Sequence, residues 1–258
     1  MQLVDRHALV TGASRGIGAA IAARLQAEGA RTILVARNKK ALDELALELS
    51  AAGTRPLTFT VDLADAVATS ALVPKILAEC GRLDILVNNA GLAESAPLHR
   101  SSDDLWNRTM TLNLRAAIQL SRAAASVMQE AGWGRIVNIA STAAQKGYAY
   151  TAAYTASKHG LLGFARAQAV ELAASGVTVN SVCPGYVDTP MTARTLANIM
   201  DKTGCDRNAA IAALASDSPL GRLVTPEEVA AAVMSFLGPN TGATTGQALG
   251  VAGGAVAP

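Results

Sequence analysis

The stretch of sequence that decides the fold is Thr11-Gly12-Ala13-Ser14-Arg15-Gly16-Ile17-Gly18. It joins a short apolar strand pattern at residues 7–11 to a helical pattern at residues 16–28. Glycines at such a junction permit a tight turn, let the backbone approach a pyrophosphate, and let the helix pack near the strand. The helix N-terminus then offers unpaired N–H groups to phosphates. The spacing of the glycines is G-x-x-x-G-x-G rather than the G-x-G-x-x-G of the common dinucleotide-binding motif. The position of the glycines, between the first strand and the first helix, is therefore what favours a dinucleotide site over a structural turn.

Strand and helix patterns alternate along the rest of the chain. We expect further strands at residues 31–36, 57–61, 84–87, 134–140, 177–182 and 247–251. We expect helices at residues 39–52 (ending at Gly53), 66–80, 103–130 (as one helix or two), 153–174 and 226–237, the last with Thr225 as N-cap and Pro226 in its first position. This alternation predicts an α/β fold: a Rossmann-type, doubly wound parallel sheet of about seven strands with helices on both faces.

One segment, residues 189–219, interrupts the alternation, because it has no strand pattern and an irregular polar pattern. An insertion between a strand end and the next helix often forms a lid over the site, and we expect that role here. The alternative is a surface excursion without a function. The rest contains no linker and no repeat, so residues 1–258 are predicted to form one dinucleotide-binding and catalytic domain.

Composition excludes several other classes of protein. Half of the residues are apolar, and the net charge is only +2, with no basic cluster dense enough for a nucleic-acid surface. The three cysteines are widely spaced, without the spacing of a metal site, so we expect free thiols and no metal. No run of about 18 apolar residues predicts a membrane span. We therefore expect a cytoplasmic protein that acts on a small molecule, without nucleic-acid or membrane partners.

The end of the second strand pattern indicates which dinucleotide binds. An NAD site usually has a carboxylate there, bonded to the ribose 2′-OH. Residues 31–42 contain no carboxylate, and Arg37 stands 19 residues after Gly18. Together with Arg15 in the glycine turn, Arg37 can clamp a 2′-phosphate, which a carboxylate would repel. We therefore predict NADP(H) as the cofactor; the alternative is that Arg37 is an ordinary exposed arginine.

The helix predicted at residues 153–174 begins with a candidate acid–base pair. Tyr154 and Lys158 are four residues apart and share one helical face. A nearby ammonium favours the phenolate, so we expect Lys158 to lower the pKa of Tyr154 toward neutrality, as acid–base catalysis requires. Ser141 follows the strand at 134–140, at the sheet edge where open α/β folds bind ligands. Asn88-Asn89-Ala90-Gly91 ends another strand at the same edge.

These motifs together resemble the short-chain dehydrogenases/reductases over nearly the whole chain. The motifs that match in order and spacing are Thr11–Gly18, Asp62, Asn88–Gly91, Asn113, Ser141, Tyr154, Lys158 and Pro184-Gly185. The resemblance implies that Tyr154 is the acid/base, that Ser141 orients the carbonyl, and that Lys158 binds the nicotinamide ribose and tunes Tyr154. It implies that Asn113 holds a water that relays protons to Lys158, and that the enzyme is a homotetramer.

The resemblance also assigns the cofactor-binding residues. They are Gly12, Ser14, Arg15, Gly16, Ile17, Gly18, Arg37, Asp62, Leu63, Asn89, Ala90, Gly91, Tyr154, Lys158, Pro184, Gly185, Val187 and Thr189. Among them Asp62 would meet the adenine, and Val187 and Thr189 would hold the nicotinamide end. The segments around Ser141, Tyr154 and residues 182–191 further resemble bacterial ketoreductases that act on acyl or polyketide thioesters.

The predicted activity is hydride transfer between NADP(H) and a ketone or secondary alcohol, with a 3-oxoacyl or polyketide-like ketone as substrate. Two alternatives stay open. One is an NAD(H)-dependent dehydrogenase that oxidises an alcohol or hydroxyacyl substrate in catabolism. The other is a regulatory protein that senses a dinucleotide without turnover, which the presence of Ser141, Tyr154 and Lys158 disfavours.

Overall fold

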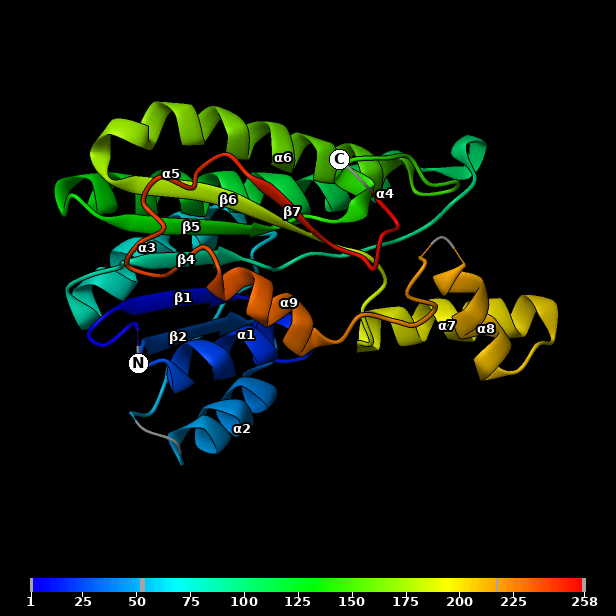
Figure 1. Ribbon diagram of the computed structural model, residues 1–258, viewed down its shortest axis with the longest axis horizontal. Coiled ribbons are helices and arrows are strands. Elements are labelled where there is room, and N and C mark those ends of the chain that lie inside the picture. Colours follow the sequence, from blue (N-terminus) through cyan, green and yellow to red (C-terminus); the bar gives the residue numbers. More distant parts are fainter. Residues whose placement is uncertain (1, 52–53, 217, 257–258) are drawn as a thin grey trace.

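The computed structural model describes residues 2–51, 54–216 and 218–256. Its centre is a parallel sheet in the order β3-β2-β1-β4-β5-β6-β7 (Figure 1). The strands are β1 (His7–Thr11), β2 (Arg31–Ala36), β3 (Leu57–Thr60), β4 (Ile85–Asn88), β5 (Gly134–Ile139), β6 (Val177–Pro184) and β7 (Ala248–Val251). The seven strands and the doubly wound parallel sheet are as predicted. The central strands β1, β4, β5 and β6 are buried along their whole length, as a parallel sheet covered on both faces requires.

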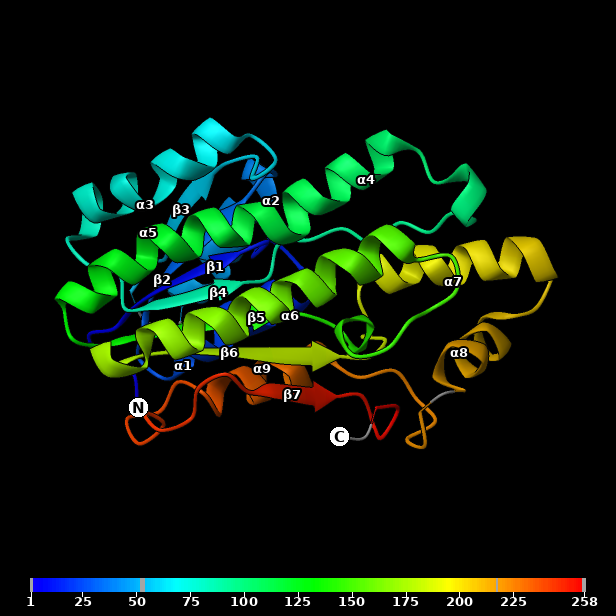
Figure 2. The same cartoon turned by 90° about the horizontal axis from the view of Figure 1, so that it is seen from above.

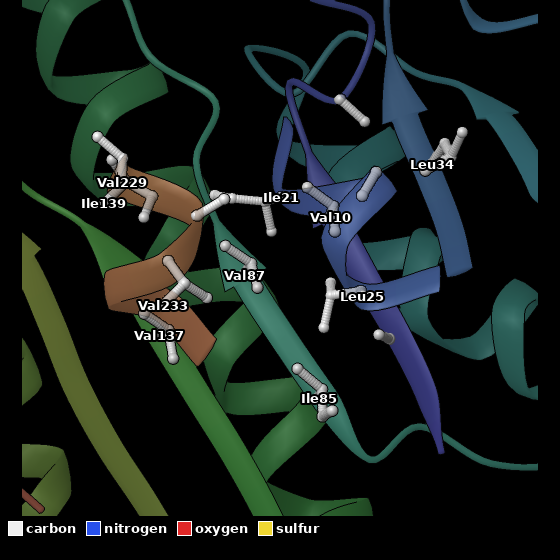
Figure 3. Close-up of a cluster of buried hydrophobic side chains, with 14 of the residues drawn as sticks. Val10, Ile21, Leu25, Leu34, Ile85, Val87, Val137, Ile139, Val229 and Val233 are labelled. Carbon is white, nitrogen blue, oxygen red and sulfur yellow. The ribbon is translucent and has the colours of Figure 1, made fainter. Parts of the chain in front are cut away.

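Helices cover both faces of this sheet. On one face lie α1 (Gly16–Ala27), α2 (Lys39–Ser50) and α9 (Pro226–Met234). Figure 3 shows the core on this face, where Ile21 and Leu25 of α1 and Val229 of α9 pack over Val87 and Val137 of the strands. On the other face lie α3 (Ala66–Cys80), α5 (Ala116–Glu130) and α6 (Ala152–Leu172), seen from above in Figure 2.

The predicted boundaries hold within two residues for most elements, and Thr225 forms a reciprocal capping box with Glu228 at the start of α9. The end of the helix predicted at residues 39–52, with Gly53, lies outside the described residues. The helix predicted at 103–130 is divided into α4 (Asp103–Met110) and α5 by a π-helical turn, Thr111–Arg115, which we did not predict. Short 3₁₀ turns occur at Leu98–Arg100, Thr142–Ala144 and Ala173–Ser175.

The segment at residues 189–219 is more regular than its sequence pattern indicated. It contains two helices, α7 (Pro190–Thr203) and α8 (Arg207–Ala215), which extend beyond the carboxyl ends of the strands (Figure 1). The Thr189 side chain caps α7, the Asp206 side chain caps α8, and Gly204 ends α7 in a left-handed conformation. The irregular polar pattern of this segment did not indicate these two helices, whose ends are defined by the caps. Residue 217 of the predicted segment lies outside the described residues.

Candidate active site

The glycine turn is a cradle that only glycines can form. Gly12 and Gly16 have φ angles of +63° and +57°, in the left-handed region that favours glycine. A Cβ on Gly18 would collide with the Gly12 carbonyl oxygen and stand 2.6 Å from Nδ2 of Asn89. The turn therefore keeps its backbone open and free of side chains where a pyrophosphate is expected, and these residues fit a dinucleotide.

The first helix offers its N-terminus to this cradle. Its N-cap residue, Arg15, makes no side-chain capping bond, and the first turn contains no acidic residue. By contrast, Asn38 caps α2 and Asp65 caps α3 with side-chain oxygens. The first N–H groups of α1 are thus left without a side-chain cap, and they and the positive end of the helix dipole suit an anionic group. Ser14 is half-buried in the turn, and Ile17 packs partly into the core.

The motif after β4 is fastened to the glycine turn by side-chain hydrogen bonds. Asn89 donates its Nδ2 hydrogens to the Thr11 carbonyl at 2.8 Å and to the Gly12 carbonyl at 3.2 Å. The Thr11 hydroxyl accepts from the backbone N–H groups of Asn89 and Ala90 at 2.9 and 3.0 Å. These bonds tie the segment after β4 to the end of β1 and to the glycine turn. Thr11 was predicted only as part of the turn, and its role in joining two strands was missed.

The proposed adenosine end lies where β2 and β3 finish. The Arg37 side chain is 72% exposed, and its Nη1 is 3.9 Å from Oδ2 of the half-exposed Asp62. Such an exposed pair at long range contributes little to stability, so the guanidinium can turn to another anion. Leu63 is buried in the core, which leaves only its backbone for contact with a cofactor. Arg15 is exposed in the glycine turn.

The residues after β6 lie beside the glycine turn. A Cβ on Gly16 would be 3.2 Å from Cγ2 of Thr189, so the start of α7 lies against the glycine turn. Val187 is buried and forms a bridge with Val224. Pro184 ends β6, and the Gly185 N–H donates to the Val251 carbonyl at 3.0 Å. The structure thus brings the predicted nicotinamide-end residues to the same edge of the sheet as the glycine turn.

The candidate catalytic side chains meet at this edge. Ser141 lies two residues after the end of β5, and its hydroxyl accepts from the Ala143 N–H at 3.1 Å. Tyr154 and Lys158 lie one turn apart on α6, and the Lys158 Nζ is 5.8 Å from the centre of the Tyr154 ring. Lys158 is only 5% exposed and donates from Nζ to the Ile139 carbonyl at 2.8 Å. The side chain of Lys158 is therefore anchored to the last residue of β5, two positions before Ser141.

We expected Lys158 to lower the pKa of Tyr154, but in the structure the pKa of Tyr154 is raised. Burial raises the pKa of the Tyr154 phenol, and a hydrogen bond with the Ser141 side chain offsets this only in part. Burial also lowers the pKa of the Lys158 ammonium to about 8. The reason is desolvation, which disfavours the charged form of each group and is the largest cause of both shifts. At neutral pH the site therefore holds a protonated phenol beside an ammonium, which is an arrangement suited to giving a proton.

Asn113 lies in the π-helical turn and is completely buried. It accepts from the Leu92 N–H at 2.8 Å and donates to the Leu92 carbonyl at 2.9 Å and to the Ser157 hydroxyl at 3.1 Å. A Cβ on Gly91 would be 3.1 Å from Oδ1 of Asn113 and 3.7 Å from Nζ of Lys158, so Gly91 keeps the space between them open. Asn113 thus lies near Lys158, and the water relay between them stays a prediction.

Ser157 was missed as a member of this network. It is fully buried, and besides accepting from Asn113 it donates to the Tyr154 carbonyl at 2.7 Å. A serine inside a helix gives no sequence signal by itself, because its importance depends on which neighbouring helix supplies a partner.

The fold and this site define a Rossmann-type oxidoreductase that works with a nicotinamide dinucleotide, and comparison with known proteins gives the family. Residues 6–199 match the short chain dehydrogenase family. The chain belongs to that family, so the predicted family, enzyme class and type of cofactor are confirmed.

Three similar proteins cover almost the whole chain. A protein of Streptomyces coelicolor assigned as a ketoacyl reductase is 41% identical over 96% of this chain and 95% of its own length. The 3-oxoacyl-[acyl-carrier-protein] reductase FabG of Salmonella typhimurium is 38% identical over 98% of each chain. The crystal structure of a variant of actinorhodin polyketide ketoreductase with NADPH has 40% identity and a TM-score of 0.93, over 99% of this chain and 98% of that one. The predicted likeness to bacterial ketoreductases is thereby confirmed.

Across the described residues, the structure contains no helix with the length and apolar character needed to cross a membrane. The three cysteines, Cys80, Cys183 and Cys205, are free thiols.

Proposed function

We propose that this protein reduces a ketone to a secondary alcohol with NADPH, and that Tyr154 supplies the proton. The observation that carries the proposal is that Tyr154 lies beside Lys158 and Ser141 at the sheet edge that also holds the glycine turn, and that desolvation raises the pKa of its phenol. When bound, NADPH supplies the hydride for the carbonyl carbon. Ser141 donates a hydrogen bond to the substrate oxygen. Tyr154 then transfers its phenolic proton to that oxygen, and the nearby Lys158 ammonium stabilises the tyrosinate that remains.

Tyr154→Phe tests this role directly. The variant lacks the proton donor but keeps the ring, so we expect turnover with NADPH to fall by at least about 100-fold, as loss of a general acid does. The Kd for NADPH, measured by fluorescence, should stay near the value of the unsubstituted enzyme. Turnover that persists in the folded variant would contradict the proposed role of Tyr154.

The preference for NADP(H) rests on the arginines at the adenosine end. Arg37 is exposed at the end of β2, and Arg15 is exposed in the glycine turn. A carboxylate at position 37 would repel the 2′-phosphate and accept a hydrogen bond from a 2′-OH. We therefore expect Arg37→Asp to change the ratio of kcat/KM for NADPH over NADH by at least about 10-fold in favour of NADH. A ratio that does not change would rule out Arg37 as the phosphate ligand.

The substrate class that we propose is a 3-oxoacyl or polyketide-like ketone. Support comes from the names of the similar proteins, which include ketoacyl reductases and a polyketide ketoreductase. A panel of 3-oxoacyl thioesters, diketones and cyclic ketones, followed by NADPH absorbance, tests this assignment. It would be contradicted if the thioesters and diketones were the poorest substrates of the panel.

We further propose one catalytic domain over residues 1–258, with α7 and α8 as a lid, assembled as a homotetramer in the cytoplasm. Support for the tetramer comes from the resemblance to short-chain dehydrogenases/reductases. The free cysteines support a reducing compartment. Light scattering should give four times the mass of the chain, and a monomer would contradict the tetramer.

A further inference from the structure

A narrow cavity lies between residues 141–151, which we call the catalytic loop, the α8 helix, and residues 252–255, which we call the C-terminal segment. Its walls include Tyr148, Tyr186, Leu214, Ala215, Ala252 and Ala255. It contains about 20 Å³ of free space, which is enough for a single water molecule. The walls are mostly alkyl and aromatic, and the guanidinium of Arg222, which also lines the cavity, is held by both carboxylate oxygens of Glu228. The chemistry of the cavity therefore suits an uncharged, apolar group.

This cavity adjoins the catalytic side chains. Tyr148 donates its hydroxyl hydrogen to Oγ1 of Thr142, the residue after Ser141, at 2.7 Å. Tyr148 and Tyr186 are also close enough to Tyr154 that their phenol groups contribute to raising its pKa. Two walls of the cavity thus belong to the surroundings of the reacting phenol, and a substrate whose carbonyl reaches Tyr154 would point a substituent toward this space.

The C-terminal segment that closes the cavity is fastened to the residues just after α8. The Ser218 hydroxyl donates to the carbonyls of Ala252 and Gly253 at 3.0 and 3.2 Å, and the Leu220 N–H donates to the Gly253 carbonyl at 3.2 Å. Gly253 and Gly254 both have left-handed φ angles, +56° and +87°. We call this contact between residues 218–220 and 252–254 the latch.

The two segments of the latch pack so closely that positions 253 and 254 have no room for a larger residue than glycine. A Cβ on Gly253 would collide with Cβ of Leu220 and stand 2.6 Å from Oγ of Ser218, and a Cβ on Gly254 would be 3.2 Å from Cγ of Pro219. On its other side the C-terminal segment is tied to the catalytic loop, because Lys146 donates from Nζ to the Ala255 carbonyl at 3.3 Å. The segment therefore bridges the two sides of the cavity.

The two helices that precede the latch in the sequence, α7 and α8, pack against each other as one unit. Leu196 of α7, Ala210 of α8 and Leu223 make a small buried cluster, with Met200 and Leu214 packed against it. Because α7 and α8 share this cluster, a contact that holds the end of α8 in place also holds α7 in place. The latch begins at Ser218, whose N–H donates to the carbonyl of Ala215, the last residue of α8, at 2.9 Å, so the latch sets how far the pair can stand from the catalytic loop.

We propose that residues 252–255, held by the latch, are a specificity-determining strap that forms the far wall of the substrate site and limits the width of the apolar group beside the reacting ketone. The inference rests on the proposed ketone reductase function. It predicts that the enzyme discriminates against wide ketones, and that loosening the latch relaxes this discrimination without changing the catalytic residues.

Two variants and a matched control test the strap. Gly253→Ala introduces the collision with Leu220, and Ser218→Ala removes both hydroxyl bonds without adding atoms. Gly250→Ala is the control, because a Cβ there meets nothing nearer than 4.0 Å and the residue lies in β7, three positions before Gly253. For each protein we would measure kcat/KM with NADPH for a slender ketone, a linear acetoacetyl thioester, and for a wide one, 2-decalone.

In both latch variants, the ratio of kcat/KM for the wide ketone over the slender one should rise by about 10-fold, the low end of what one methylene of space does to discrimination. The ratio should stay at its original value in Gly250→Ala, and KM for NADPH should not change in any variant. An unchanged ratio in Ser218→Ala would overturn the strap, as would an equal loss of activity on both ketones, which would show a merely structural contact. If Gly253→Ala does not fold, Ser218→Ala decides.

The activity of the unsubstituted enzyme on the two ketones shows whether the strap proposal or the proposed ketone reductase function is wrong. If it reduces neither ketone with NADPH, the proposed function and the strap fall together. If it reduces the slender ketone while the latch variants keep its ratio, only the strap falls.

Discussion

The pH dependence of ketone reduction follows from the burial of Lys158. Its pKa is lowered to about 8, because the ammonium lies almost fully inside the protein, next to the Ile139 carbonyl. Below this pKa the side chain is charged and can stabilise the tyrosinate that forms at Tyr154. Above it the side chain is neutral and that stabilisation is lost. The pKa of Tyr154 is raised by burial, so the phenol itself keeps its proton through the same range.

The size of the effect can be worked out from these values. With a pKa of about 8, roughly 90% of Lys158 is charged at pH 7 and roughly 10% at pH 9. The kcat/KM for ketone reduction should therefore fall by about 10-fold between pH 7 and pH 9, along a single limb. We expect no matching loss toward pH 6, since both Lys158 and Tyr154 are already protonated there.

The assay is NADPH oxidation at subsaturating ketone, in buffers of constant ionic strength from pH 6 to pH 9.5. Lys158→Arg is the control, because a guanidinium stays charged throughout this range, and the alkaline limb should disappear even if the rate is lower. A profile that is flat to pH 9.5 in the unsubstituted enzyme would refute the reasoning. So would the same limb in Lys158→Arg, because the titrating group would then lie elsewhere.

Two further predictions concern the glycine turn and α9. Gly18→Ala places a methyl group against the Gly12 carbonyl and Asn89, so the Kd for NADPH should rise by at least about 10-fold; a Kd within experimental error of the original value would contradict the cradle. Thr225→Ala removes the hydroxyl that accepts from the Glu228 N–H at 3.2 Å, and the free energy of unfolding in urea should fall by about 1 kcal/mol; no loss would mean that the capping box is not stabilising.

Most of the sheet and much of the site could be predicted because the signals are local. Each buried strand is a short apolar run, and the glycine turn lies directly between β1 and α1. The spacing of Tyr154 and Lys158 alone places them on one helical face, and Ser141 follows β5 as expected. Parallel strands bring their carboxyl ends to one edge, so these separate motifs were expected to meet there.

The features that were missed depend on contacts between distant residues. The π-helical turn at Thr111–Arg115 continues an unbroken helical pattern in the sequence, and Asn113 is turned inward by its bonds to Leu92 and Ser157. The direction of the Tyr154 pKa shift is set by burial, which the sequence spacing to Lys158 does not describe. The latch depends on Gly253 meeting Leu220, residues brought together only by the fold.

The π-helical turn also constrains how this region of the chain can change in length. A wide turn accommodates one residue more than an α-helical turn, and each residue advances an α-helix by about 100°. If residues 111–115 ran as regular α-helix with no residue removed, α4 would be rotated by about that angle relative to α5. Because α4 packs against α6 while α5 packs against the sheet, both contacts could not keep their present phase. The wide turn thus takes up the extra residue within itself and points Asn113 inward, so deleting one residue here would let a regular helix keep the contacts of both α4 and α5.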